Sequence, residues 1–271
     1  MTYKHLKAAV FDWAGTMVDF GSSAPMGAFV DVFSEFGVPI SIADARKPMG
    51  LPKLDHIRAL GAMPHIADAW REAHGGAPFD EAAANEVYKL YVPRVSAVVP
   101  DYADLIPGAA ETVAALRAGG LKIGSTTGYT RSVMEGVLPR AADQGYAPDN
   151  LVCADDVPEG RPTPLMMYRC FLDLCVWPAA SVVKVDDTAP GITEGRAAGS
   201  WTVGVALSGN EAGLSAEEYG ALRDSDRQAL REKAGSVLAD ADYVIDTVAD
   251  LMPVMDEIEQ RMASGERPRI S

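Results

Sequence analysis

The sequence predicts an α/β protein whose core is a parallel sheet and whose first strand is followed by an inserted all-helical segment. Short apolar runs recur along the chain and end in polar residues, which is typical of buried parallel strands. Helical patterns separate these runs, and such alternation favours a parallel sheet. From about residue 21 to residue 99 the pattern is helical only. We therefore expect a core domain at 1–20 and 100–271 and a helical domain at 21–99.

The expected core strands are short. The first, Leu6–Phe11, presents Asp12 at its carboxyl end. The later strands are expected at Leu121–Gly124, Asn150–Cys153, Val182–Val185, Trp201–Val205 and Tyr243–Ile245. The expected helices between them include Ala109–Ala118, Arg131–Arg140, Pro164–Leu174 and Ile192–Ala198.

The inserted segment is expected to contain five helices. They are Pro25–Phe36, Ile42–Arg46, Pro52–Leu60, Ile66–His74 and Glu81–Tyr91. Ser23, Ser41 and Asp80 are candidate N-caps, because a short side-chain oxygen can accept a backbone N–H of the first turn. Gly37 and Gly61 stand where helices are expected to stop.

The composition restricts the partner and the compartment. The 271 residues include 24 Lys and Arg against 38 Asp and Glu, a formal net charge of −14. This balance argues against nucleic acid or an anionic membrane as partner, since both require exposed cations. Three cysteines are too few for a disulfide framework, and no stretch reaches signal-peptide or transmembrane length. We expect a cytoplasmic protein that acts on a small molecule.

Side chains suited to chemistry follow three expected strands. They are Asp12, the pair Thr126 and Thr127, and the pair Asp186 and Asp187. Ligands of open α/β sheets bind at the carboxyl ends of the strands, so these groups should converge. Converging carboxylates repel each other, and a hard cation such as Mg²⁺ relieves that repulsion. Taken singly, each Asp is better explained as a turn residue. The set as a whole favours a magnesium site.

Four segments, in order, resemble the motifs of the haloacid dehalogenase superfamily. Asp12–Thr16, Asp-Trp-Ala-Gly-Thr, resembles the first motif, Asp-x-x-Gly-Thr, and Ser125–Gly128 resembles the second. Arg161 stands where the third motif has its cation, and Asp186-Asp187 resembles the acidic fourth motif. The resemblance covers the whole core. It implies a Rossmann-like parallel-sheet core, with the helical insertion as a cap domain.

The resemblance also implies roles for these residues. Asp12 would be the nucleophile that forms an aspartyl-phosphate. Mg²⁺ would be held by Asp12, the main-chain carbonyl of Ala14 and Asp187, with Asp186 as a further or indirect ligand. The division between the two acids stays open because some relatives carry an acid at the position of Gly191.

The phosphoryl group has its own implied set of binding residues. Thr127 would donate a hydrogen bond to its oxygens, with Thr126 as the alternative one position away. Gly128 would let the backbone approach, and Arg161 would offer a charged, bidentate fork.

Position 14 departs from the phosphatase pattern. Phosphatases and mutases of the superfamily usually carry a second Asp two residues after the nucleophile, where it protonates the leaving alkoxide. Ala14 cannot transfer a proton. The chain is therefore expected to be a poor phosphomonoesterase, either because it is a degraded enzyme or because its leaving group is not an alkoxide.

A basic run, Arg46–Arg58, lies in the inserted segment. A solvated helix face would account for it. Together with Ala14, however, the run resembles the phosphonoacetaldehyde hydrolase family, in which the lysine at the position of Lys53 forms a Schiff base with the substrate aldehyde. Neighbouring cations are expected to lower the pKa of Lys53 and so to supply free amine.

Other residues near Lys53 receive weaker roles from this resemblance. His56 lies three residues further on the same helix face and could shuttle protons, although a surface position fits it equally well. Met49 and Gly50 resemble a loop that closes over the site, and Met49 could equally be packing. Tyr129 is placed to line the pocket.

The expected function is hydrolysis of the carbon–phosphorus bond of phosphonoacetaldehyde to acetaldehyde and phosphate, with Mg²⁺. The alternatives are a phosphatase or phosphomutase of the same superfamily and an inactive relative that binds a phosphorylated ligand. The resemblance further implies a homodimer through the cap, for which Met26–Phe36 is a candidate surface, although a segment with this helical spacing is more often internal core. The base that activates water for dephosphorylation is not identified.

Overall fold

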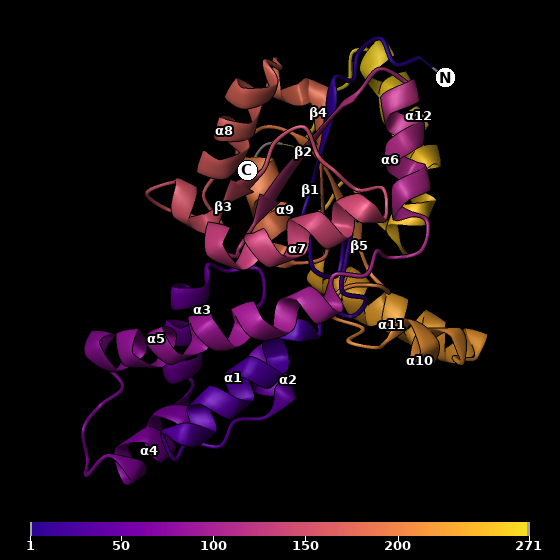
Figure 1. Ribbon diagram of the computed structural model, residues 1–271. Coiled ribbons are helices and arrows are strands. Elements are labelled where there is room, and N and C mark those ends of the chain that lie inside the picture. Colours follow the sequence, from indigo (N-terminus) through magenta and orange to yellow (C-terminus); the bar gives the residue numbers. More distant parts are fainter. Residues whose placement is uncertain (1, 270–271) are drawn as a thin grey trace.

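The core of the computed structural model, which describes residues 2–269, is a six-stranded parallel sheet in the order β3-β2-β1-β4-β5-β6 (Figure 1). The strands are β1 Ala8–Phe11, β2 Lys122–Thr127, β3 Val152–Cys153, β4 Val182–Asp186, β5 Trp201–Val205 and β6 Tyr243–Ile245. Every neighbouring pair is parallel. The predicted α/β fold class is confirmed, and each expected strand is present.

Two strands run further than the sequence pattern indicated. β2 continues through Thr127, which pairs with Cys153, and β4 continues through Asp186, which pairs with Gly204. Polar residues after an apolar run were expected to be loop, yet these polar residues are buried and stay in the ladder. The sheet itself therefore fixes their side-chain directions.

Helices cover both faces of the sheet. The core helices are α6 Ala109–Ala118, α7 Arg131–Asp143, α8 Leu165–Leu174, α9 Ala189–Ala197, α10 Ala216–Gly220, α11 Asp224–Val237 and α12 Leu251–Ala263. α8 packs on the face that presents Val10 and Val182, whereas α6, α7 and α12 share a core with Phe11 and Ile123 on the other face (Figure 1). The sequence pattern did not indicate α10–α12. In α11 only Ala234 is buried, so that helix lacks the apolar stripe by which an amphipathic helix is recognised.

The five expected helices after β1 are present and pack together at one end of the molecule (Figure 1). They are α1 Ala24–Glu35, α2 Ile42–Arg46, α3 Lys53–Gly61, α4 Pro64–Ala73 and α5 Glu81–Val98. We refer to α1–α5 as the helical insertion. The expected end of α5 at Tyr91 was wrong. The helix continues past Pro93 because Val87, Tyr91 and Val95 keep a four-residue spacing that buries one face.

The helix caps agree with expectation at two of three positions. The hydroxyl of Ser41 accepts the N–H of Asp44, and the Asp80 carboxylate accepts the N–H of Ala83. The Ser23 side chain makes no capping bond. Asp19 replaces it, because its carboxylate accepts the backbone N–H groups of both Ser23 and the following residue at 2.9 Å.

The two expected helix-stopping glycines behave differently. Gly37 follows α1 with φ +73°, a conformation that glycine adopts without strain. Gly61 is the last residue of α3, and a Cβ there would lie 2.0 Å from Cδ1 of Phe79. Gly61 therefore makes room for a ring.

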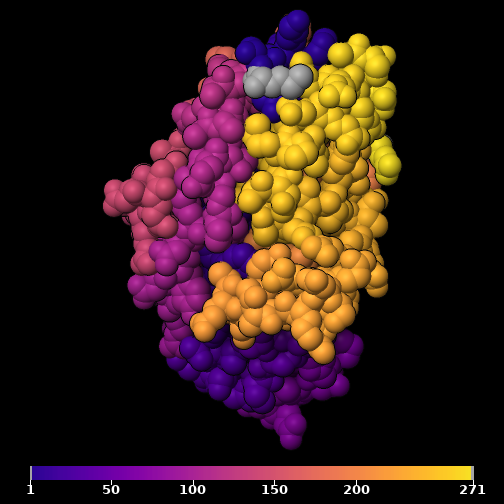
Figure 2. Space-filling view, turned by 90° about the vertical axis from the view of Figure 1, so that its right-hand side faces the viewer, coloured from indigo at the N-terminus to yellow at the C-terminus, as the bar shows by residue number. Residues whose placement is uncertain are grey.

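Figure 2 shows the helical insertion, in indigo to purple, at the lower end of the molecule, with the segment containing α10 and α11, in orange, directly above it. Arg46 of α2 joins these two regions by donating hydrogen bonds to the carbonyl of Gly21 and to Asn210. Within residues 2–269, no helix combines the length and apolarity needed to cross a membrane. The three cysteines are free thiols.

Candidate active site

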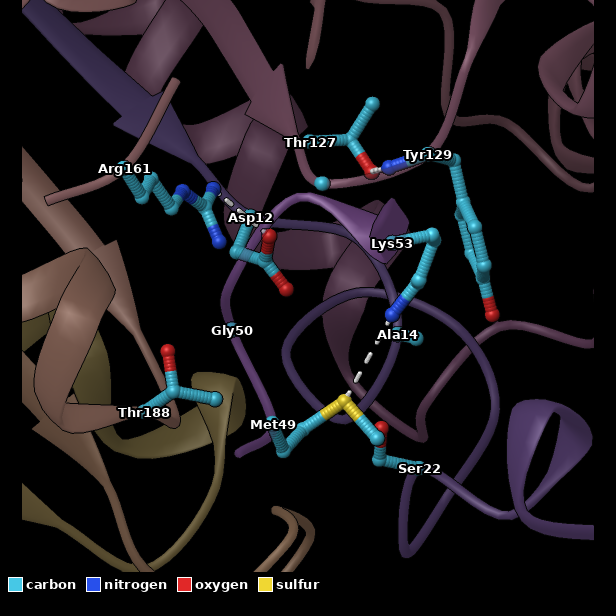
Figure 3. A pocket seen from close by; sticks show the side chains of 11 residues that line it. Asp12, Ala14, Ser22, Met49, Gly50, Lys53, Thr127, Tyr129, Arg161 and Thr188 are labelled. Carbon is cyan, nitrogen blue, oxygen red and sulfur yellow. Dashed lines mark hydrogen bonds and ion pairs between the residues drawn. The ribbon is translucent and has the colours of Figure 1, made fainter. Parts of the chain in front are cut away.

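A small cavity lies where the carboxyl ends of β1, β2 and β4 meet the helical insertion (Figure 3). It is lined by Asp12, Ala14, Ser22, Met49, Gly50, Lys53, Thr127, Gly128, Tyr129, Arg161 and Thr188. The structure thus brings together most of the residues singled out in the sequence, although they are far apart along the chain. Asp12 follows β1, Thr127 ends β2, and Arg161 lies between β3 and α8. The insertion supplies a loop and one amine.

Three carboxylates meet at the floor of this site. Asp12, Asp186 and Asp187 are buried and offer oxygens that lie within 4.8 Å of one another. Burial, with repulsion from Asp186, raises the pKa of Asp12 to about 6. Burial and the two neighbouring acids raise the pKa of Asp187 well above its usual range. A hard divalent cation would relieve this excess of negative charge, so the donor set fits Mg²⁺.

The two adjacent acids have different partners. Asp186 Oδ2 lies 3.0 Å from Lys184 Nζ and 3.3 Å from Arg161 Nη2. These cations hold the pKa of Asp186 below its usual range although burial opposes them. Asp187 accepts hydrogen bonds from Asn210 N and a threonine hydroxyl, and no cation of residues 2–269 pairs with it. The contacts favour Asp187 over Asp186 as a direct metal ligand.

Gly191 explains how an extra acid fits at position 186. A Cβ on Gly191 would lie 2.0 Å from Cγ of Asp186, so the Asp186 carboxylate fills the space that a side chain at position 191 would need. Asp186 and an acid at position 191 are therefore sterically exclusive.

Arg161 is fixed over the nucleophile candidate. Its Nη2 lies 2.8 Å from Oδ1 of Asp12 and donates to the carbonyl of Thr126, while its Nε donates to Glu194. No described residue accepts a hydrogen bond from Nη1, and Arg161 lines the cavity. A free donor therefore remains for an anionic ligand, as the expected phosphoryl-binding fork requires.

The two threonines of β2 are separated by the alternation of the strand. Thr127 lines the cavity, and its Oγ1 accepts the N–H of Tyr129 at 3.1 Å, which leaves its O–H free to donate. Thr126 points away from the cavity and donates to Glu194 at 3.0 Å. Successive side chains of a strand face opposite ways, so the structure removes Thr126 as a substrate-binding candidate.

Lys53, the first residue of α3, brings its amine into the cavity from the helical insertion (Figure 3). The residue is 7% exposed. Its Nζ lies 3.8 Å from Sδ of Met49, 5.1 Å from the ring centre of Tyr129 and 5.9 Å from that of Phe29. No carboxylate of residues 2–269 pairs with it. Burial lowers the pKa of Lys53 to about 8.

The expected cause of that pKa shift was wrong. Burial is the main cause, and Arg161 is the cation that contributes. The cations of the basic run are engaged elsewhere: Lys47 pairs with Asp44, Arg58 pairs with Asp55 and Glu81, and Arg46 donates to the core. They do not gather around Lys53.

Two glycines let the insertion approach the core. Gly50 has φ +93°, and a Cβ there would lie 2.3 Å from Oγ1 of Thr188. A Cβ on Gly128 would lie 3.0 Å from the carbonyl oxygen of Leu51. Both residues line the cavity, so the loop around Met49 meets the sheet edge through close backbone contact.

His56 is neither on the surface nor in the cavity. It is fully buried, its Nε2 lies 2.8 Å from the carbonyl oxygen of Ala45, and its ring stacks on Phe29 at 4.1 Å. Burial and the nearby Lys53 lower its pKa well below the usual range. His56 does not line the cavity, and its Nδ1 has no hydrogen-bond partner among the described residues. Its role as a proton shuttle stays a prediction.

Several site residues carried no recognised sequence signal. Ser22 lines the cavity with a buried hydroxyl that has no hydrogen-bond partner among the described residues. Tyr129, which was expected to line the pocket, also has a hydroxyl without a described partner. Thr188 lines it too. Lys184 and Glu194 lie just beneath. Lysine within the apolar run of β4 was the one available signal, because a charge in a buried strand requires partners.

Comparison with known proteins defines the class of protein. A family model for haloacid dehalogenase-like hydrolases matches residues 6–199, and this range includes all four motifs. The fold, the site and this match define a haloacid dehalogenase-like hydrolase.

Full-length relatives define the family more closely. The chain is 52% identical over 267 residues to phosphonoacetaldehyde hydrolase of Paraburkholderia xenovorans strain LB400, covering 98% of this chain and 100% of that protein. It is 50% identical to that of Bordetella pertussis strain Tohama I, covering 97% and 96%. The crystal structure of a phosphonoacetaldehyde hydrolase-like protein from Oleispira antarctica matches with a TM-score of 0.96 and 42% identity, covering 99% and 98%. The chain belongs to the phosphonoacetaldehyde hydrolase family.

Proposed function

We propose that the protein hydrolyses the carbon–phosphorus bond of phosphonoacetaldehyde, releasing acetaldehyde and phosphate. The observation that carries this proposal is that one cavity holds a carboxylate, Asp12, and a buried amine, Lys53, which has no ion-pair partner among residues 2–269. Family membership supports the substrate.

The first step uses the Lys53 amine. Its lowered pKa provides free amine near neutral pH, which attacks the aldehyde carbon. Loss of one water gives a protonated imine between Lys53 and the substrate. This step solves the leaving-group problem, because the cationic nitrogen can accept the electron pair of the carbon–phosphorus bond.

The second step uses Asp12. One carboxylate oxygen attacks phosphorus, the carbon–phosphorus bond breaks, and its electrons form a neutral enamine on Lys53. Arg161 and Thr127 hold the phosphoryl oxygens. No proton is delivered to a leaving oxygen, which makes the absence of an acid at Ala14 compatible with catalysis.

Two hydrolyses complete the cycle. The enamine takes up a proton on carbon, and water releases acetaldehyde and free Lys53. A second water cleaves the aspartyl-phosphate and returns Asp12. One water enters at this point, one was lost on imine formation and one is consumed on imine hydrolysis, so the net reaction consumes one water.

Mg²⁺ would be held by Asp12, the main-chain carbonyl of Ala14 and Asp187, with Asp186 as an indirect partner. When bound, the ion supplies positive charge that screens the nucleophile from the anionic substrate. The raised pKa of Asp187 supports this set.

The organisation of the chain supports the same proposal. We propose that residues 21–99 form a cap domain over a core of residues 1–20 and 100–271. We also propose that two copies of the protein pair through their caps. The protein is proposed to be cytoplasmic, and its free thiols support a reducing compartment. Analytical ultracentrifugation, with a charge introduced on the cap surface, tests the dimer.

The direct test measures acetaldehyde and phosphate release from phosphonoacetaldehyde, with Mg²⁺ and after its removal by a chelator. A panel of sugar phosphates and other monoesters serves as comparison. Equimolar products that require Mg²⁺ are expected. Turnover of monoesters in preference to phosphonoacetaldehyde would favour the phosphatase or phosphomutase alternative, and binding without turnover would favour an inactive relative.

A further inference from the structure

Beneath the cavity lies a buried ion pair that the proposed reaction does not use. Lys184, in the middle of β4, and Glu194, on α9, are both 0% exposed, and Lys184 Nζ lies 3.2 Å from Glu194 Oε2. Neither residue lines the cavity. Buried charges are costly unless they are paired and hydrogen-bonded, so the cluster requires an explanation.

The ammonium group of Lys184 is fully engaged. Besides Glu194, its Nζ lies 3.0 Å from Asp186 Oδ2 and donates to Thr126 Oγ1 at 2.6 Å. An ammonium has three protons, and here three acceptors surround it. Lys184 therefore joins the acidic floor of the site to a hydroxyl of β2.

Glu194 gathers the groups that fix Arg161. Its Oε2 accepts from Arg161 Nε at 3.1 Å and from the hydroxyl of Thr126 at 3.0 Å. Thr126 Oγ1 in turn accepts from Arg161 Nη2 at 2.9 Å. Because Nε is held by Glu194, the planar guanidinium presents Nη2 to Asp12 and leaves Nη1 for a ligand.

The packing of α9 against β4 is built around the same side chains. A Cβ on Gly195 would lie 2.7 Å from Cβ of Lys184, and a Cβ on Gly191 would lie 2.0 Å from Cγ of Asp186. The two glycines, four residues apart on one helix face, thus make room for two charged residues of the strand.

We propose that Lys184 and Glu194 are positioning residues for the phosphoryl-binding site. Together they fix the orientation of Arg161. Lys184 also forms an ion pair with Asp186. The inference rests on the proposed function for its kinetic readout. The binding of inorganic phosphate, which carries the same oxygens, is independent of that function.

The test compares two double variants with the wild-type protein. Lys184→Met/Glu194→Leu removes both charges of the pair. Asp186 and Asp12 keep Arg161 as a partner, so folding is expected to persist. Arg196→Met/Asp240→Leu is the matched control, since it removes an ion pair at the solvent side of the same helix. For each protein, folding is checked by circular dichroism, phosphate affinity by calorimetry with Mg²⁺, and kcat and KM with phosphonoacetaldehyde.

We expect the buried double variant to fold, to bind phosphate roughly ten- to a hundredfold more weakly, and to lose kcat, because hydrogen bonds to charged groups are misplaced. The control should match the wild type in all three measurements. Wild-type phosphate affinity and kcat in the folded buried variant would overturn the proposal and leave the pair a folding role only.

A second variant covers the case in which the double variant does not fold. Glu194→Gln preserves the volume and an acceptor for Arg161 Nε but loses the charge that gathers both cations. Phosphate binding roughly three- to tenfold weaker than wild type is expected, and unchanged binding contradicts the proposal. If the wild-type protein binds phosphate but does not hydrolyse phosphonoacetaldehyde, the proposed function fails while the binding comparison still tests the positioning role.

Discussion

The two buried lysines of the described chain lie in opposite surroundings. Lys53, in the helical insertion, touches a thioether and two aromatic rings and faces the cavity. Lys184, in the sheet, contacts two carboxylates and a hydroxyl and does not reach the cavity. The same side chain is thus buried once without ion-pair partners and once fully paired.

The difference shows that the surroundings of a buried lysine decide whether it is a reactive amine or a structural cation. Burial without a partner disfavours the charged form and lowers the pKa of Lys53 to about 8, which supplies a nucleophilic amine. Burial with partners makes Lys184 part of a rigid charged framework that places Arg161 and Asp186. The reactive amine comes from the helical insertion, whereas the framework comes from the core: Lys184 and Asp186 lie on β4 and Glu194 lies on α9.

The largest expected effect comes from removing the nucleophile on the sheet side. Asp12→Asn should reduce phosphate release by about 10⁵-fold or more, in the range for loss of a covalent nucleophile. Imine formation at Lys53 should persist, because the aldehyde reacts with the amine and not with Asp12. Phosphate release measures the first expectation and borohydride trapping of the imine measures the second, both on the same sample. Loss of trapping together with turnover would show that imine formation at Lys53 depends on Asp12.

Lys53→Arg should have the next largest effect. Arginine keeps the positive charge but cannot form the imine, so turnover should fall by roughly 10³-fold or more, about 4 kcal/mol of barrier. Lys47→Arg is the matched control, because Lys47 is exposed and paired with Asp44. Steady-state assays of acetaldehyde release measure both. Substantial activity in Lys53→Arg would mean that charge alone explains the role of Lys53.

Removing Lys184 should lower the stability of the protein more than removing Lys53, the reverse of the expected order for imine formation. Lys184→Met leaves Glu194 and Asp186 short of a cation and should lower the free energy of unfolding by about 3–5 kcal/mol. Lys53→Met removes a buried amine that has no ion-pair partner in the described part of the chain, so stability should be unchanged within about 1 kcal/mol or should increase. Urea unfolding followed by fluorescence measures both variants. Equal losses of stability in the two variants would contradict the difference in ion pairing between the two lysines.

The smallest effect is a shift in pH dependence. The neutral amine is the reacting form, so the rate of imine formation should rise with pH up to about 8 and then level off. Met49→Glu places a carboxylate beside Lys53, favours the ammonium, and should move this profile upward by about 1–2 pH units. Met49→Gln controls for shape and polarity. An unshifted Met49→Glu profile would show that Lys53 does not set the pH dependence.

The sequence predicted the sheet, the helical insertion and most of the cavity lining, because each strand pattern ends in polar residues that must meet at one edge. It did not predict the surroundings of the lysines. The basic run around Lys53 predicted that neighbouring cations lower its pKa, yet those side chains contact Asp44, Asp55 and the core. Spacing along a helix does not report which partner each long side chain reaches.

The residues beneath the cavity were missed for a related reason. Glu194 lies on a helix whose pattern shows no functional motif, and its importance depends on two cations from separate segments. The choice between Thr126 and Thr127 depended on where β2 ends, because a one-residue difference exchanges the faces of the strand. These contacts depend on the packing of segments that are distant in the sequence, so the local sequence pattern does not predict them.

The most direct test of the central claim is to identify the lysine that forms the imine. The protein is incubated with phosphonoacetaldehyde, reduced with borohydride, digested and analysed by mass spectrometry, with Asp12→Asn used to accumulate the adduct. A two-carbon adduct, or one that retains the phosphonate, is predicted on Lys53 and not on Lys184. An adduct on another lysine, or none from a sample that turns over, would contradict the account.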